Sequence, residues 1–124
     1  LRTKLQRLDG WLSERRRIAA LYGEHLPDGV RPVSSLDESL HHLFVIRTVG
    51  RDSLADHLKR NGVETKVHFP VPLHRQRAPW GDPGAPLPLA EDWCGSVLSL
   101  PCYPGLRDDE VIRTCALIEA WRRR

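Results

Sequence analysis

The densest group of side chains that could do chemistry lies in one short segment, which carries Lys66, His68, His74 and Arg75. Alternation along a strand puts Lys66 and His68 on the same face. The Pro-x-Pro unit at 70–72 stiffens the exit of that strand and fixes where His74 and Arg75 point. An ammonium, two imidazoles and a guanidinium this close together predict a cradle for a phosphate or pyrophosphate. An exposed edge strand with solvated charges would show the same pattern.

Other residues that often carry chemistry form no recognisable motif. Of the pair His41-His42, we expect one ring to face the core and the other to face solvent. Cys94, Cys102 and Cys115 contain no CxxC unit, so they are interpreted as reduced thiols of a cytoplasmic protein. No Cys/His spacing matches a zinc site, and no metal is expected. The chain also lacks Gly-x-Ser-x-Gly, Gly-x-Gly-x-x-Gly and Walker motifs.

The composition is that of one folded domain. The chain has 124 residues, of which 40% are hydrophobic and 28% are charged. No apolar run approaches the ~20 residues that a membrane span needs. The net charge of +3 only weakly favours anionic partners. Nucleic acid binding is a less favoured alternative, because Phe44 and Phe69 are the only side chains placed to stack on bases from a sheet.

A long amphipathic helix is predicted over residues 1–26. Apolar residues recur at steps of three and four, Arg15 interrupts the stripe, and Pro27 and Gly29 end the helix. Such a helix is long for so small a domain, which favours docking against another domain or chain. The chain contains no methionine and opens with Leu1, so we also expect a further part upstream. The stripe consists of Leu1, Leu5, Leu8, Leu12, Ala19, Tyr22 and Leu26.

The body of the domain, residues 40–124, is predicted to mix strands and helices. A polar loop at 31–40 precedes it. Asp52 is the expected N-cap of its first helix, and Asn61-Gly62 the expected end. The order predicts an α+β fold in which helices cover a small, mostly antiparallel sheet. The expected elements are strand 42–49, helix 52–60, strand 63–69, irregular loop 73–88, helix 89–95, strand 97–100 and helix 108–121.

Several of these stretches, taken in order, resemble one enzyme family. The opening Leu-x-x-Leu-x-x-Trp-x-x-x-Arg-Arg and the Thr-x-x-His-aromatic-x-x-Pro-x-His run at 65–74 are typical of it. The stretches at 42–47, 51–62 and 97–106, and the Asp-Asp-Glu that opens the last helix, complete the pattern. Over residues 1–121 the chain therefore resembles the carboxy-terminal domain of the DegT/DnrJ/StrS family of nucleotide-sugar aminotransferases.

The resemblance implies a fold-type-I enzyme that uses pyridoxal 5'-phosphate. Such an enzyme moves an amino group from glutamate or glutamine to a keto sugar, and is implied to act as a homodimer. The cofactor is held by a lysine of a larger, amino-terminal domain. None of Lys4, Lys59 and Lys66 fits that role, so this segment alone is expected to be inactive.

The resemblance also implies where the substrate binds. His68, Phe69 and His74 would line the nucleotide-sugar pocket, with Lys66 or Arg75 near phosphate oxygens. Family members often carry Tyr where this chain has Phe69, so a hydrogen bond there is lost. The main alternative is a stand-alone module that binds a nucleotide sugar or regulates another protein without catalysis.

Overall fold

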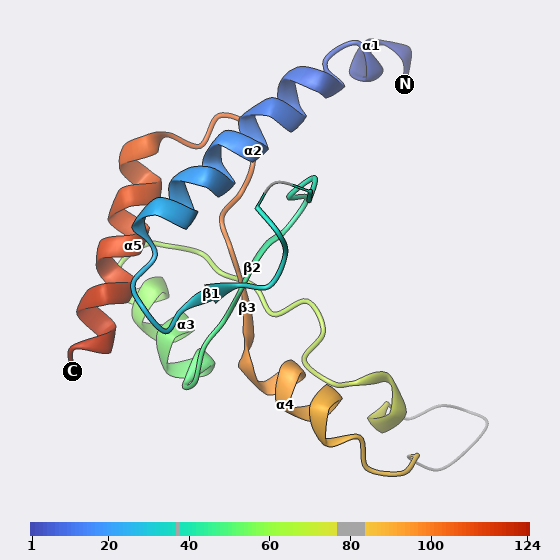
Figure 1. Cartoon of the computed structure of the whole chain (residues 1–124), viewed down its shortest axis with the longest axis vertical. Coiled ribbons are helices and arrows are strands. Elements are labelled where there is room, and N and C mark those ends of the chain that lie inside the picture. The colour runs from blue at the N-terminus through green and yellow to red at the C-terminus, as the bar shows by residue number, and fades with distance from the viewer. Residues whose placement is uncertain (37, 77–83) are drawn as a thin grey trace.

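The structure is a computed structural model, which describes residues 1–36, 38–76 and 84–124. Its centre is a three-stranded antiparallel sheet in the order β1-β2-β3 (Figure 1). The strands are β1 (Arg31–Pro32), β2 (Phe44–Arg47) and β3 (Val97–Leu100). The predicted α+β class is therefore confirmed. No helix within the described residues is long and apolar enough to cross a bilayer.

Helices surround the sheet and extend beyond it at two corners. The first is broken into α1 (Arg2–Leu5) and α2 (Leu8–His25), and α3 (Arg51–Arg60) follows β2. A short 3-10 helix, η1 (Leu73–Arg75), and α4 (Pro88–Ser96) form an arm that projects away from the sheet (Figure 1). The last helix, α5 (Asp108–Arg122), packs against both α2 and α3.

The core forms where the inner face of the sheet meets these helices. In β2, Phe44 and Ile46 are buried and pair in register with Leu100 and Leu98 of β3. The ring of Tyr22, from α2, stacks on Phe44 with 4.7 Å between ring centroids. Aromatic pairs of this kind add about 0.5–1.5 kcal/mol to the burial of their area. Helices α2, α3 and α5 contribute the other buried side chains, among them Ile18, Ala19, Leu54, Leu58, Val111, Cys115 and Ile118.

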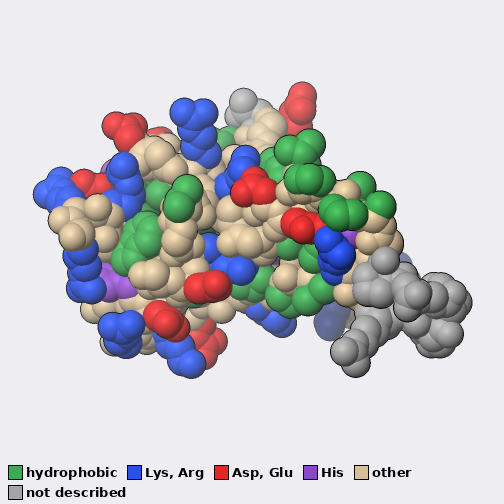
Figure 2. Space-filling view, turned by 90° about the horizontal axis from the view of Figure 1, so that it is seen from below, with side chains coloured by type: hydrophobic (Ala, Val, Ile, Leu, Met, Phe, Trp, Pro, Cys, Tyr) green, Lys and Arg blue, Asp and Glu red, His purple; other side chains and the backbone are tan. Residues whose placement is uncertain are grey.

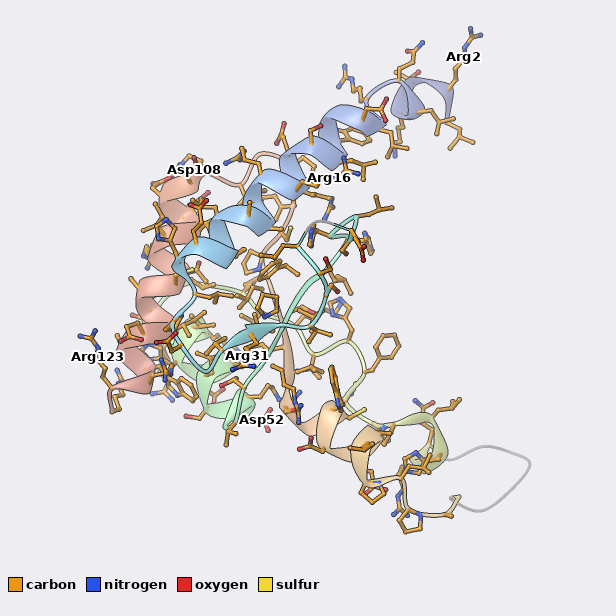
Figure 3. All side chains as sticks on the ribbon, viewed as in Figure 1. Arg2, Arg16, Arg31, Asp52, Asp108 and Arg123 are labelled. Carbon is orange, nitrogen blue, oxygen red and sulfur yellow. The ribbon has the colours of Figure 1, made fainter. Side chains whose placement is uncertain are left out.

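The start of the long helix does not share in this core. Of the predicted stripe, only Ala19 and Tyr22 are fully buried, whereas Leu1, Leu5 and Leu8 are 95%, 57% and 42% exposed. The break at 6–7 separates α1 from α2, so the predicted single helix is two helices along one path (Figure 1). Arg2 marks the free end in Figure 3. The amino-terminal apolar stripe therefore faces solvent in this chain.

The predicted strand at 63–69 was wrong. This segment pairs with the sheet at one point only, an antiparallel bridge between Lys66 and Ser99. The alternation that suggested a strand is real, since Val63 is buried and Val67 packs against the core. Within this segment only Lys66 forms a β-bridge to β3. The prolines at 70 and 72 have no N–H with which to continue the pairing.

Two smaller expectations also differ from the structure. The loop predicted at 31–40 includes β1, because Arg31 pairs with Arg47. The N-cap of α3 is Gly50, in the left-handed region at φ 75°, rather than Asp52, which lies in the first turn. Of the predicted loop 73–88, residues 77–83 lie outside the described part. The helices at 89–95 and 108–121 and the strand at 97–100 are confirmed.

Two glycines give a matched test of the backbone. Gly50→Ala is expected to lower the free energy of unfolding by about 1–2 kcal/mol, the cost of a left-handed residue that carries a Cβ. The new Cβ would also meet Trp121 at 3.2 Å. Gly10→Ala, inside α2 with nothing within 4 Å, is expected to raise the unfolding free energy by about 0.5–1 kcal/mol. Urea denaturation of both variants measures the two changes, and equal signs would contradict this account.

Candidate functional site

Lys66 and His68 line a pocket of about 490 Å³ beside the sheet. One wall is the segment 62–68, which follows α3. β3 and the connection 101–106 that leads to α5 also line it. The remaining lining comes from His42 and Leu43 and from the first turns of α5, through Glu110, Arg113 and Thr114.

The imidazole of His68 is held in place from the floor of this pocket. Its Nδ1 shares a hydrogen bond of 3.0 Å with the hydroxyl of Ser99, a buried residue of β3. The bridge between Lys66 and Ser99 consists of two backbone bonds, Lys66 N–H to Ser99 O at 3.1 Å and Ser99 N–H to Lys66 O at 2.9 Å. Ser99 therefore orients the His68 ring while the backbone places Lys66 at the rim.

The pocket offers both positive and negative groups to a ligand. Lys66 and Arg113 supply cations, and Glu64 and Glu110 supply carboxylates. Cations of this kind bind phosphate oxygens, whereas carboxylates accept hydrogen bonds from sugar hydroxyls. Together with the imidazole of His68, the arrangement suits a polar ligand that carries both an anionic and a hydroxylated part.

His42, Tyr103 and Arg113 are among the lining residues that were not predicted from the sequence. His42 was considered only as one of a structural pair, of which one ring was expected to face the core and the other solvent. Tyr103 lies in a stretch that supported the family resemblance, without a role of its own. Arg113 lies on the exposed face of α5, and no local pattern distinguishes it from other surface arginines. Only the packing of α5 beside the segment 62–68 brings it to the pocket.

His74 and Arg75 belong to a separate cluster on the arm. One carboxylate oxygen, Oε1 of Glu91 in α4, accepts a bond from Arg75 Nε at 3.0 Å and lies 2.9 Å from His74 Nε2. The backbone N–H of Leu87 donates to the same oxygen at 3.3 Å. Bonding to His74, then to Arg75, lowers the pKa of Glu91 from 4.5 to about 2. The cluster ties η1 to the first turn of α4.

The predicted cradle is therefore divided in two. Neither His74 nor Arg75 lines the pocket that holds Lys66 and His68, because the Glu91 carboxylate holds both of them on the arm. Phe69 lies between the two groups, 74% exposed. Figure 2 shows hydrophobic side chains gathered over this arm, on the right of the view. The exposed apolar residues there are Phe69, Val71, Leu73, Leu87, Leu89 and Trp93.

His41, Cys102 and Cys115 are buried. His41 is buried with Nε2 2.9 Å from the Leu36 carbonyl, and His42 is exposed, which confirms the expected division of that pair. Burial raises the pKa of the Cys115 thiol to about 12 and also raises that of Cys102. Among residues 1–36, 38–76 and 84–124, no three His, Cys, Asp or Glu side chains gather closely enough to hold a metal ion.

Comparison with known proteins places this fold in a defined group. Residues 1–119 match the DegT/DnrJ/EryC1/StrS aminotransferase family. The whole chain is 38% identical to the dTDP-3-amino-3,4,6-trideoxy-alpha-D-glucose transaminase of Streptomyces venezuelae and covers 34% of it. Over 98% of its length it is 33% identical to the dTDP-3-amino-3,6-dideoxy-alpha-D-galactopyranose transaminase of Aneurinibacillus thermoaerophilus, again covering 34%.

A solved structure agrees with these sequence matches. The crystal structure of S. venezuelae DesV in complex with a ketimine intermediate superposes on 99% of the chain with a TM-score of 0.88 and 36% identity. The chain covers 35% of that protein. It thus spans about one third of the length of the relatives it matches.

The Glu91 cluster makes stability depend on pH in a defined direction. Because the folded-state pKa of Glu91 is about 2 and its ordinary value is 4.5, the stabilisation is complete above about pH 4.5 and is lost as the pH falls through about 2. The difference in unfolding free energy between the wild type and Glu91→Gln should therefore shrink as the pH falls, as measured by urea denaturation. Glu24→Gln, on α2, is the control, and a difference independent of pH would contradict the ion pairing.

Proposed function

Because the chain belongs to the DegT/DnrJ/EryC1/StrS aminotransferase family, we propose that it is the small domain of a pyridoxal-phosphate-dependent sugar transaminase. The proposed acceptor is a keto sugar linked to a nucleotide, as the names of two relatives suggest. Glutamate or glutamine is the proposed amino donor, and the complete enzyme is proposed to be a homodimer. The observation that carries the proposal is a family match over almost the whole chain, which includes the residues of the pocket.

In this proposal the pocket at Lys66 and His68 receives part of the nucleotide sugar. Lys66, together with Arg113, would contact phosphate oxygens, since ammonium and guanidinium groups bind them strongly. His68 is held by Ser99, so its second ring nitrogen is already oriented for a sugar oxygen. A ring fixed before binding loses less entropy when the substrate arrives.

The arm is the proposed second contact. Phe69 exposes a flat ring on which a nucleotide base or sugar could stack. His74 and Arg75 would act next to it, with Glu91 fixing their direction. Because that carboxylate already neutralises part of their charge, we assign the phosphate contact to Lys66 rather than to Arg75.

The residues of this chain do not provide a site for pyridoxal phosphate. Its attachment needs a lysine in a shielded pocket, but Lys4, Lys59 and Lys66 are all exposed. When bound, the cofactor stabilises the carbanion through which the amino group is exchanged. We propose that both the lysine and the cofactor pocket lie in a larger domain, so that this chain alone is inactive.

The exposed apolar stripe at the amino terminus fits the same proposal. Leu1, Leu5 and Leu8 expose large apolar side chains along one path, at the end of the helix that points away from the sheet (Figure 1). Leu8 also lines a groove, together with Trp11, Leu12, Leu40 and Pro104. We propose that this stripe packs against the larger domain.

A self-contained binding module is the second candidate. It is favoured by the core, which α2, α3, α5 and the sheet complete within this chain. Such a module would bind a nucleotide sugar without exchanging an amino group. Two measurements separate the candidates: titration of the chain with pyridoxal phosphate and with thymidine diphosphate, and an assay of transamination by the protein in its natural form. A binding module would bind thymidine diphosphate without any transamination, whereas the transaminase would show both.

The pocket contact is tested by substitution. In the complete transaminase, Lys66→Met should weaken binding of a thymidine-diphosphate sugar about tenfold or more, because it removes a bond to a charged phosphate. His68→Ala should weaken it by up to about tenfold, because it removes a bond to a sugar oxygen. Isothermal titration measures the affinity. Lys59→Met, which removes an exposed lysine near the end of α3, is the control and should bind as the wild type does. Unchanged affinity in both pocket variants would place the substrate elsewhere.

The proposed docking stripe gives a second test. Leu5→Ser and Leu8→Ser should leave the unfolding midpoint of this chain nearly unchanged, because both side chains are already exposed. In the complete protein the same changes should lower the midpoint by several degrees, since each removes buried apolar area worth ~1.5–3 kcal/mol. Differential scanning calorimetry on both forms measures this contrast. Equal effects in the two forms would contradict interdomain packing.

A further inference from the structure

Arg15 binds three backbone carbonyls from two distant segments. Its Nη1 donates to the carbonyls of His41 and His42, each at 3.0 Å, and to that of Cys102 at 2.5 Å. The first two belong to the chain that enters β2, and the third follows β3. One guanidinium on α2 therefore joins the start of one central strand to the end of its neighbour. Bonds from a charged donor are roughly twice as strong as neutral ones.

The backbone at His41 shows why this anchor matters. His41 has φ 48°, the only positive value of a non-glycine residue in the described part of the chain. A residue with a Cβ keeps this conformation only where its surroundings hold it. Three contacts do so here: Ser39 Oγ accepts the His41 N–H at 3.2 Å, the Leu36 carbonyl lies 2.9 Å from its ring, and Arg15 binds its carbonyl.

The anchored residues lead directly into the pocket wall. His42 follows the strained residue and lines the pocket that holds Lys66 and His68. Tyr103, next to Cys102, lines the same pocket. Arg15 itself does not line this pocket, so any influence on a ligand there acts through these neighbours.

The other side chains of α2 that bond to these segments reach only the one that follows β3. Tyr22 donates to the Pro101 carbonyl at 3.0 Å, and Glu14 accepts the Gly105 N–H at 2.7 Å. Arg17 pairs with Asp108, which Figure 3 shows at the start of α5 beside α2. Within the described residues, Arg15 is the side chain of α2 that donates bonds both to the segment before β2 and to the segment after β3.

From this geometry we propose that Arg15 is a positioning residue for substrate, fixing His42 and Tyr103 relative to each other in the pocket lining. The proposal rests on the proposed function, in that it takes the pocket to receive the nucleotide part of the sugar. The ligand class is a nucleoside diphosphate. Arg15 carries no step of the reaction and contacts no substrate atom.

The test compares Arg15→Met and Arg15→Lys with Arg16→Met in the complete protein. Arg16 is the neighbouring exposed arginine of the same helix, so its variant controls for loss of one charge. Thymidine diphosphate is the probe in isothermal titration. We expect the dissociation constant to rise about tenfold in Arg15→Met, less in Arg15→Lys, whose ammonium still donates bonds, and not at all in Arg16→Met.

A double-mutant cycle shows whether the effect passes through His42. If Arg15 acts by placing that side chain, adding Arg15→Met to His42→Ala should weaken binding much less than Arg15→Met does alone. In Arg15→Met, the rate at which the donor transfers its amino group to the enzyme-bound cofactor, measured without the sugar, should stay within about twofold of the wild type. The reason is that we expect the donor to bind without contacting His42 or Tyr103. A general loss of structure would lower that rate as well.

The outcomes separate this inference from the proposed function. Additive effects in the cycle, equal losses in the donor rate and in nucleotide affinity, or unchanged affinity in Arg15→Met would each overturn the positioning role. If the wild type binds thymidine diphosphate but does not aminate a thymidine-diphosphate keto sugar, the proposed function fails, and the affinities still decide the role of Arg15. If the wild type does not bind thymidine diphosphate, the inference is overturned.

Discussion

The stack of Tyr22 on Phe44 is the contact on which the rest of this structure depends. It joins the first long helix to the central strand, the one strand that pairs on both edges within the described sheet. The buried hydroxyl of Tyr22 donates to the Pro101 carbonyl, and burial raises the pKa of Tyr22 far above its ordinary range. The ring therefore stays neutral, and a single side chain fixes helix, sheet and the chain leaving β3 relative to one another.

This arrangement explains how a small domain can shape a pocket without large secondary-structure elements in its walls. The segment 62–68 makes one bridge to Ser99, and the segment 101–106 is irregular. β3 nevertheless holds the first at Lys66 and His68, and α2 holds the second at Pro101, Cys102 and Gly105. Irregular segments suit ligand recognition because they present backbone and side chains in many directions, provided that a rigid scaffold positions them.

The basic groups on the arm and Lys66 at the pocket differ in whether a carboxylate pairs with them. On the arm, Glu91 compensates His74 and Arg75, so that cluster serves mainly to join η1 to α4. At the rim of the pocket, Lys66 is exposed, and within the described part of the chain no ion pair joins it to the carboxylates of Glu64 and Glu110. This difference is why we assign phosphate recognition to the pocket. Family membership and the structural superposition support a transaminase setting for it, in which this chain spans about one third of its relatives' length.

Local periodicity and turn chemistry were enough to predict most of the elements. The spacing of apolar residues indicated α2, α3 and α5, and the ordered motifs indicated the family, because both kinds of signal lie within short stretches of sequence. The selection of Lys66 and His68 likewise needed only the alternation of one segment. Tertiary structure decided which of the selected residues lie together. The separation of His74 and Arg75 depends on Glu91, sixteen or more residues further along the chain.

The same limit applies to the residues that were not selected. His42, Tyr103 and Arg113 reach the pocket through packing between segments that are far apart in sequence, and Arg15 looked like an interruption of an apolar stripe. Sequence by itself determined the helices, the family and the candidate chemistry, because these depend on neighbours along the chain. Only the tertiary structure decided the pocket, because contacts between distant segments bring its lining together. Arg15, for example, binds carbonyls that lie 26 and 87 residues further along the chain, and no local pattern encodes such contacts.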